Sequence, residues 1–398
     1  MPLPSQWHSK LPPPLLALVS LVGFCILVRV HSFSLSQPLR KSASTTMKAT
    51  QSSSTSSAIT REWKTLDPSI FSSPVSEKDG FRYAKDDEYL AAVLGSWEEA
   101  VATQESSQPH KVETSPWIYY DDMGTPLYGH IVRPIVSSDS SGGSSPQQPG
   151  ILLFHTAAGP QDVFLFQKAA QLASSDLGCV VLICDVLSDQ DGWAWTPNGD
   201  RTKFNTLKDE LLQENASRMR SRVQAAVRSL VGSSELGVDP KRLASLGWCF
   251  GAQPILELAN LQHQQDIDSK IGKESDALAF SVTAMISYHG VYRRDSSGLQ
   301  DISTTSEAEL HNENPEREVL ICTGKSDPFV ASEDLEFARA TMQKQNFSVR
   351  IMEFDGAKHG FTNPAQDFNS SPAFQYNEAA ATQSWETSMA LLRRKLLT

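Results

Sequence analysis

Cysteine is scarce in this chain, and its spacing excludes two common uses of the residue. The 398 residues include five cysteines, and no C-x-x-C pair occurs, so neither a zinc knuckle nor a thioredoxin motif is indicated. Cys179, Cys184 and Cys322 lie in apolar segments typical of buried strands, where cysteine serves as a small core residue. Cys25 lies in an N-terminal apolar run, whereas Cys249 stands between two glycines. Cys249 is therefore the cysteine whose surroundings indicate chemistry.

Nucleotide-binding and metal-binding signatures are missing as well. The chain has no G-x-G-x-x-G and no G-x-x-x-x-G-K-[ST] sequence, so we predict no nucleotide cofactor. His155 and His289 lack the Asp, Glu or Cys company expected of a metal site. We therefore expect a protein that works without a cofactor or a bound metal.

Acidic residues are absent from the first 60 residues, which carry five basic ones. Because the net charge of the whole chain is −11, the remainder carries −16. An acidic body of this kind argues against nucleic acid as a partner.

The N-terminal 60 residues have the composition of a targeting region. The apolar run Leu15–Val28 is shorter than the roughly 20 residues of a membrane span and fits a signal-peptide core. A signal-peptide-like segment (1–32) followed by a Ser/Thr-rich, basic, transit-like segment (33–60) resembles the bipartite plastid address of algae with secondary plastids. We expect a plastid location and no stable membrane partner after processing. Secretion and an uncleaved membrane anchor at residues 15–30 remain open.

The pattern G-x-S-x-G does not occur, but its cysteine counterpart does, as Gly247-x-Cys249-x-Gly251. A predicted strand (Arg242–Leu246) precedes it and a predicted helix (Ala252–Asn260) follows. A strand-to-helix turn this sharp strains the backbone at the central residue, and the flanking glycines let the chain approach itself closely. The start of the helix favours a thiolate. The pattern therefore predicts a nucleophile elbow with Cys249 as its reactive group.

Two groups downstream complete the order nucleophile, acid, histidine. Asp327 follows the predicted strand Glu318–Cys322, and His359 follows the predicted strand Ser348–Phe354. Both groups therefore lie at the carboxyl ends of strands, where open α/β sheets place their sites.

Four motifs together resemble the dienelactone hydrolase family. They are Gly247-Trp248-Cys249-Phe250-Gly251, Ser287-Tyr288-His289-Gly290, Asp327-Pro328-Phe329-Val330 and His359-Gly360-Phe361-Thr362-Asn363-Pro364. The resemblance runs from about Trp117 to Leu397. It implies an α/β-hydrolase fold, with a mostly parallel central sheet and helices on both faces, and hydrolysis of a small-molecule ester or lactone. Carried over by position, Cys249 is the nucleophile, His359 the base and Asp327 its orienter.

The resemblance also assigns the oxyanion hole to the backbone N–H groups of Ala157 and Phe250. The chain departs from the founding members of the family at two places. Thr156 stands where they carry a glutamate, and Thr362-Asn363-Pro364 replaces a region with a substrate-binding arginine. These departures argue against a dienelactone as the substrate and leave the triad intact.

Three further residues are candidates for the substrate pocket. Trp193 and Trp195 belong to a predicted connection from Gly192 to Lys208, where they either line a pocket for an apolar substrate or cover the sheet edge. His289 follows a predicted strand and either faces the pocket or forms hydrogen bonds in the core. Both alternatives stay open.

The chain divides into three predicted parts: the targeting region (1–60), a helical extension (61–115) and the hydrolase domain (116–398). In the extension, an apolar stripe predicts a helix over Asp86–Thr103 that either packs on the hydrolase domain or forms a lid. In the domain, a predicted helix has a basic run that we expect to face solvent: Arg218, Arg220, Arg222 and Arg228. The alternative is that one of these arginines meets a substrate carboxylate.

These observations predict an enzyme that cleaves esters or lactones through a thioester-type acyl-enzyme on Cys249. The alternative is a redox-sensing or ligand-binding thiol protein that uses a hydrolase scaffold without turnover. A sensor needs no Asp327 and His359 in triad order, and it usually has a resolving cysteine nearby, so the order of the three residues favours the hydrolase.

Overall fold

The computed structural model describes residues 62–71, 87–104, 110–135, 147–189, 193, 201–272, 279–293 and 316–397, with side chains of the helix at 87–104 described only at 91–99. Contacts divide the chain into Met1–Ala58 and Ile59–Thr398, and the described residues belong to the second unit. The predicted targeting segments (1–32 and 33–60) and Trp195 lie outside the described residues. None of the described helices is long and apolar enough to cross a membrane.

Nine strands of the described residues form one mixed sheet, with the order β1-β2-β3-β5-β4-β6-β7-β8-β9. Pairs from β1 to β5 are antiparallel, and all pairs from β5 to β9 are parallel. The strands are β1 (Lys64–Thr65), β2 (Val112–Tyr120), β3 (Pro126–Pro134), β4 (Gln148–Phe154), β5 (Val180–Cys184), β6 (Val238–Trp248), β7 (Val282–Tyr288), β8 (Glu318–Gly324) and β9 (Ser348–Phe354).

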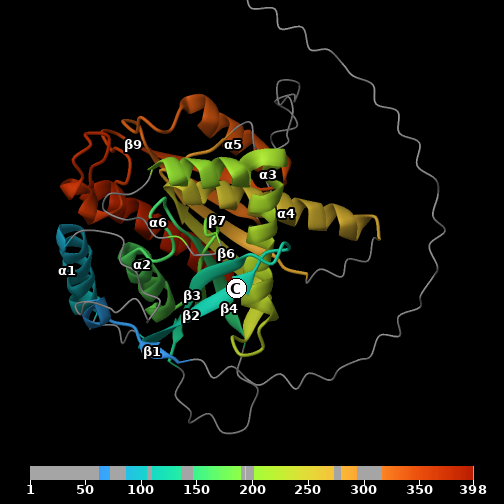
Figure 1. Cartoon of the computed structure of the whole chain (residues 1–398), viewed down its shortest axis with the longest axis horizontal. Helices are drawn as coiled ribbons and strands as arrows, with labels where there is room; N and C mark the ends of the chain where they lie inside the picture. The colour runs from blue at the N-terminus through green and yellow to red at the C-terminus, as the bar shows by residue number, and fades with distance from the viewer. Residues whose placement is uncertain are drawn as a thin grey trace, which may run out of the picture. The chain divides into compact units, whose positions relative to one another are not determined.

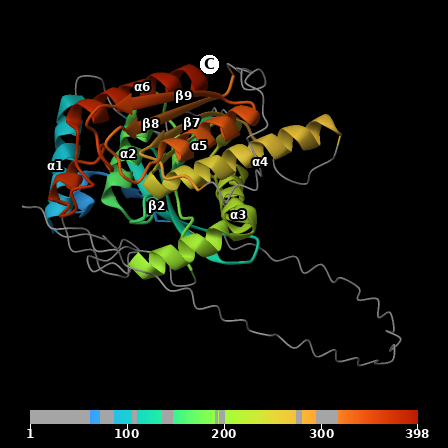
Figure 2. The same cartoon turned by 90° about the horizontal axis from the view of Figure 1, so that it is seen from above.

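Helices cover both faces of the sheet (Figure 1). The helices α2 (Val163–Ser174) and α6 (Glu378–Leu396) pack on one face, and α1 (Asp87–Gln104) packs on α2. The helices α3 (Arg201–Gly232), α4 (Ala252–Lys270) and α5 (Ser332–Lys344) pack on the other. Figure 2 shows the sheet from above, between these two layers. Short 3-10 helices are η1 (Pro68–Phe71), η4 (Cys249–Gly251) and η7 (Pro364–Phe368).

The central strands are apolar on both sides because helices cover both faces. Along β4, Ile151 and Leu153 belong to the core under α2 and α6, whereas Leu152 and Phe154 belong to the core under α3 and α4. The predicted fold class, an α/β-hydrolase architecture with a mostly parallel sheet, is confirmed. The three cysteines expected in the core are also confirmed as buried: Cys179, Cys184 and Cys322.

Two predictions about α3 are wrong. Residues 201–208, expected within a connection, form its first turns, although only Phe204 and Leu207 of this stretch pack against the core. Positive φ angles at residues 214–216 then break the helix into two segments.

The second error concerns Arg222, which was expected to face solvent but is only 1% exposed. Its Nη1 donates to the carbonyl oxygen of Val186 at 2.9 Å, and its Nε lies 3.4 Å from Oδ2 of Asp121. A buried carboxylate and a strand-end carbonyl therefore hold the guanidinium in the core, and neither partner is visible from the spacing within the helix.

The order of the strands reverses at β4, which lies between β5 and β6. Parallel sheets form a crevice at such a switch point, outside the carboxyl ends of the strands. The loops after β4 and β6 carry Ala157 and Cys249, so the fold brings these two predicted site residues together.

Candidate active site

The turn after β6 is a strained elbow. Cys249 has a φ of 54°, which is rare for a residue with a side chain. A Cβ at Gly247 would lie 2.4 Å from the carbonyl oxygen of Gly251, and a Cβ at Gly251 would lie 2.5 Å from that of Phe154. Both positions therefore require glycine, and β6 can turn directly into η4 and α4 with Cys249 at the apex.

Asp327 and His359 form a buried pair beside the elbow. Asp327 follows β8 and His359 follows β9, and Oδ2 of Asp327 lies 2.7 Å from Nδ1 of His359. The other carboxylate oxygen of Asp327 accepts a hydrogen bond from the N–H of Phe329 at 2.9 Å. Since Nδ1 of His359 is occupied by the carboxylate, Nε2 is the nitrogen that remains for Cys249, to which His359 is hydrogen-bonded.

The side chains of Cys249 and His359 share a proton, and their surroundings favour the state in which both are charged. Burial raises the pKa of the Cys249 thiol, but the charge and hydrogen bond of His359 and the N–H of Phe250 outweigh burial, so the pKa falls below its ordinary value. Burial lowers the pKa of His359, but the Cys249 thiolate and Asp327 raise it to about 10. The directions of the two shifts therefore favour a thiolate on Cys249 beside an imidazolium on His359.

The other described cysteines show what burial does without such a partner. Burial raises the pKa of Cys179 and of Cys322 to about 12, and it raises that of Cys184 well above its ordinary value. Reactivity of a thiol follows its thiolate fraction. Of the four described cysteines, Cys249 is the one prepared to act as a nucleophile.

A cavity of about 440 Å³ opens above Cys249. Its floor consists of Thr156, Ala157, Cys249 and His359. One side, which we call the C-terminal wall, is formed by residues 360–374, including Phe368 and Phe374. A rim of apolar rings continues around His359, since the ring centroids of Phe329 and Phe374 lie 4.9 Å and 5.2 Å from its imidazole.

The sequence profile of the dienelactone hydrolase family matches residues 140–271 and 274–396, well over half of the chain. The chain belongs to the dienelactone hydrolase family. Membership of this family identifies the protein as an ester hydrolase, and a small-molecule ester is accordingly its class of substrate. No curated relative matches the chain.

Solved structures share the fold. A dienelactone hydrolase-like promiscuous phosphotriesterase from metagenomic libraries is 23% identical, with a TM-score of 0.52, and the match covers 71% of this chain and 98% of that one. A protein designated m3DLH is also 23% identical, with a TM-score of 0.53 over 72% of this chain and 99% of that one. At this level of identity, the likeness shows the α/β-hydrolase fold.

The structure places the residues that the family resemblance pointed to. Ala157 lines the cavity, and the N–H of Phe250 faces the sulfur of Cys249. His289 lines the cavity too, with its ring centroid 4.7 Å from that of His359 in a T-shaped arrangement. Trp193 lies behind the loop after β4, where its Nε1 donates to the carbonyl oxygen of Ala157 at 2.9 Å.

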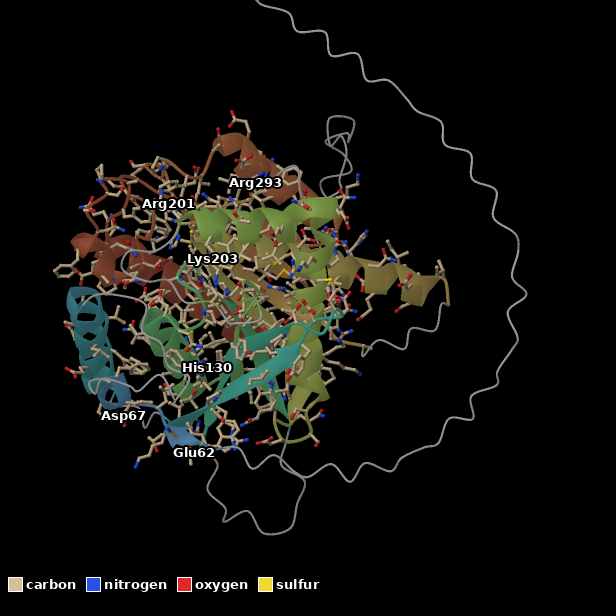
Figure 3. All side chains as sticks on the ribbon, viewed as in Figure 1. Glu62, Asp67, His130, Arg201, Lys203 and Arg293 are labelled. Atoms are coloured by element: carbon tan, nitrogen blue, oxygen red, sulfur yellow. The ribbon has the colours of Figure 1, made fainter. Side chains whose placement is uncertain are left out.

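Two charged residues of the cavity were not predicted. Arg201, the first residue of α3, lines the cavity and is exposed (Figure 3). Asp162 lines it as well, while its side chain caps α2 by accepting the N–H of Phe164 at 3.1 Å. Asp162 is recognisable in sequence as a residue before a helix, but the sequence carries no signal that brings Arg201 to this site. No cluster of three or more potential metal ligands occurs among the described residues.

Proposed function

We propose that this protein hydrolyses esters or lactones through a thioester intermediate on Cys249, with His359 as the acid–base group and Asp327 as its orienter. The observation that carries the proposal is the geometry of the site: Cys249 stands at the apex of a strained elbow, on the floor of a cavity that His359 also lines. The lowered pKa of Cys249 agrees with this geometry. The buried Asp327–His359 hydrogen bond at 2.7 Å and the cavity above the sulfur support it.

The reaction begins from the charged pair. The Cys249 thiolate attacks the ester carbonyl carbon, a sulfur–carbon bond forms and the carbonyl electrons move onto oxygen. The imidazolium of His359 then gives its proton to the departing alcohol as the carbon–oxygen bond breaks, and the acyl group stays on sulfur. Neutral His359 next takes a proton from water, whose oxygen attacks the thioester and releases the acid and Cys249.

Two backbone N–H groups receive the negative oxygen of each tetrahedral intermediate. They are the N–H of Ala157, which lines the cavity, and the N–H of Phe250, which faces the sulfur of Cys249. Donors placed before the reaction starts stabilise the developing charge without reorganisation, and losing one costs roughly 2.7–4 kcal/mol of barrier. Asp327 holds the imidazole so that Nε2 faces the sulfur.

The cavity selects for a compact substrate with an apolar group and an anionic one. Its volume of about 440 Å³ is at the small end of ligand pockets. Phe368 and Phe374 offer apolar surface, and Arg201 offers a positive charge at the same opening. We therefore propose an ester or lactone of a small carboxylic acid that carries a further negative charge away from the scissile bond.

We also propose that residues 1–60 direct the chain to a plastid. The acid-free, Ser/Thr-rich composition supports this address, and a reducing compartment suits a free thiolate. A fluorescent protein fused to residues 1–60 should enter the plastid of an alga with a secondary plastid. Secretion of the fusion, or its retention in a membrane, would contradict this proposal and favour a secreted or membrane-anchored protein.

The decisive experiment combines turnover with trapping of the intermediate. The purified protein is given short-chain nitrophenyl esters, and mass spectrometry after an acid quench measures an acyl adduct on Cys249. Cys249→Ala should retain the fold by circular dichroism and lose at least about 10³-fold in kcat. Cys179→Ala, which removes an inert core thiol, serves as the matched control and should retain both turnover and adduct.

Two outcomes contradict the proposal. Undiminished turnover in Cys249→Ala would remove Cys249 from the reaction. No turnover and no adduct, together with rapid alkylation of Cys249 by iodoacetamide, would favour the alternative of a redox-sensing or ligand-binding thiol.

A further inference from the structure

The loop after β4 is held by hydrogen bonds that leave one of its N–H groups unused. The carbonyl oxygen of Thr156 accepts from Nδ1 of His155 at 2.6 Å and from the N–H of Gly159 at 3.1 Å. The N–H of Ala158 donates to Oγ1 of Thr156 at 3.1 Å. Among the described residues, the N–H of Ala157 donates no hydrogen bond. It is therefore available to a substrate.

The direction of this N–H follows from the peptide bond that carries it. The peptide between Thr156 and Ala157 is trans, so its C=O and its N–H point in opposite directions. His155 draws the C=O to the inner side of the loop, and the N–H of Ala157 consequently projects to the other side, where Ala157 lines the cavity with Cys249. A hydrogen bond to the carbonyl also polarises the peptide and strengthens its N–H as a donor.

The partners of His155 determine its tautomer. The carbonyl oxygen of Thr156 can only accept, so Nδ1 of His155 carries the proton. The N–H of Val186 points at Nε2 from 3.3 Å, so Nε2 is the acceptor. Burial lowers the pKa of His155, which keeps the ring neutral although Asp185 lies 4.0 Å from Nε2.

The carboxylate of Asp185 is occupied by backbone donors. Its oxygens accept the N–H groups of Tyr128, Leu187 and Ser188 at 2.8–3.1 Å. These bonds hold the loop after β5, which in turn presents the N–H of Val186 to His155. The ring of His155 therefore has a fixed position as well as a fixed tautomer.

Trp193 fixes the next peptide of the same loop. Its Nε1 donates to the carbonyl oxygen of Ala157 at 2.9 Å. Its ring packs against Gly159, where a Cβ would lie 2.6 Å from Cδ1 of the indole. Successive carbonyls of the loop are thus held by one histidine and one tryptophan.

We propose that His155 is a positioning residue of the oxyanion hole, which aims the N–H of Ala157 at the developing negative oxygen, and that Trp193 assists it. This inference rests on the proposed function, because it assigns a task to residues that support the reaction at Cys249. His155 touches neither the substrate nor the reacting atoms in this scheme, and it acts through the peptide between Thr156 and Ala157.

The test uses two substitutions that separate the nitrogens of the imidazole. His155→Asn places its amide NH2 donor near the position of Nδ1, whereas His155→Gln places its amide near the position of Nε2 and leaves no donor near that of Nδ1. We expect kcat to fall about 10²-fold in His155→Gln and by less than about 10-fold in His155→Asn, with KM little changed in both. Trp193→Phe, which retains the ring and loses the N–H donor, should lower kcat by roughly 3–10-fold.

Two thiol reagents distinguish aiming of the hole from a general disturbance of the site. A short aldehyde adds to Cys249 and places its oxygen in the oxyanion hole. In alkylation by iodoacetamide, the thiolate displaces iodide from carbon, and no oxyanion forms that the hole would stabilise. His155→Gln should weaken inhibition by the aldehyde about 10²-fold and leave the alkylation rate within about 2-fold of the parent. Equal losses with both reagents, or equal kcat in the Gln and Asn variants, would overturn the inference.

Failure of the proposed function can be distinguished from failure of the role assigned to His155. If the parent protein shows neither turnover, nor an acyl adduct, nor aldehyde inhibition that protects Cys249, the function itself is wrong and the inference falls with it. If the parent shows all three and His155→Gln matches it, only the role of His155 is wrong.

Discussion

The floor of the cavity and its C-terminal wall are built by different means. The floor is held by polar contacts: the Asp327–His359 hydrogen bond, the elbow at Cys249 and the pinned peptide at Ala157. The C-terminal wall contains short polar turns, such as the cap of η7, where Asn363 accepts the N–H of Ala365 at 3.0 Å.

Apolar packing from outside supports that wall. Helix α1 packs against η7 and does not contribute any of the described residues that line the cavity. Of the two alternatives for this helix, the structure shows one packed on the domain. The side chain of Trp97 is buried, with its ring 5.6 Å from that of Phe71. In α2, Gln167 donates to Ser96 at 3.3 Å. From this difference we expect the floor to determine the rate of reaction and the wall to determine which ester fits.

The largest effect is expected at the floor, from Asp327→Asn. The amide retains the size of the side chain but no longer stabilises the imidazolium, and it favours the wrong tautomer of His359. We expect kcat to fall about 10⁴-fold with KM within a few-fold of the parent, as measured by steady-state kinetics on a nitrophenyl ester. A fall of less than 10-fold would mean that Asp327 does not orient the base.

The support of the C-terminal wall by α1 is tested by Trp97→Ala, a change in α1 outside the cavity. Removing a buried indole costs about 3–5 kcal/mol of the free energy of unfolding, which urea denaturation measures. Because η7 then loses part of its support, KM should rise while the alkylation rate of Cys249 stays constant. Trp385→Ala in α6, which removes a partly buried indole outside the cavity, is the control. Equal changes of KM in both variants would show that the effect is general destabilisation.

Residues of the floor were predictable from sequence because each one must follow a strand in a fixed chain order. Strand β9, which precedes His359, begins and ends at the predicted residues, and the elbow needs both glycines around Cys249. These constraints are local, so they can be recognised from the spacing of residues in the sequence.

The contacts that support the floor and form the wall join distant segments, so the spacing of residues does not reveal them. Arg222 is buried by Asp121, 101 residues earlier, and Trp193 contacts Ala157, 36 residues earlier. Arg201 lines the cavity from the start of a helix whose first turns lack a continuous apolar stripe. Tertiary contacts therefore determine the support of the floor and the composition of the wall.

The charged pair on the floor can be separated by His359→Gln. Without the imidazolium, burial becomes the largest influence on Cys249 and raises its pKa above the ordinary value of 9.0. A thiol of that pKa is at most about 1% thiolate at pH 7, so alkylation by iodoacetamide should slow by up to about 100-fold.

The dependence of the alkylation rate on pH should differ between the parent and His359→Gln. As the pH falls below 9, the parent should retain more of its alkylation rate than the variant, because the lowered pKa of Cys249 keeps more of the thiol ionised there. The variant should gain about 10-fold per pH unit up to at least pH 9. Turnover of the parent should fall above about pH 10, where His359 loses the proton that the leaving alcohol requires. Parallel alkylation profiles in the two proteins would contradict the charged pair.

The smallest effect is expected at the edge of the wall, from Arg201→Gln. Among the described residues no acidic group forms an ion pair with Arg201, so its guanidinium is available to a carboxylate of the substrate.

Since the site is open to solvent, we expect KM to rise only about 3–10-fold for an ester with a distant carboxylate and to stay constant for its neutral isostere. The difference should shrink as salt is raised. Lys203→Gln, two residues along the same helix (Figure 3), is the matched control. Lys203 pairs with Asp189 at 3.3 Å and is not among the described residues that line the cavity. If the two variants raise KM equally, the effect comes from the overall charge of the helix start rather than from a contact at Arg201.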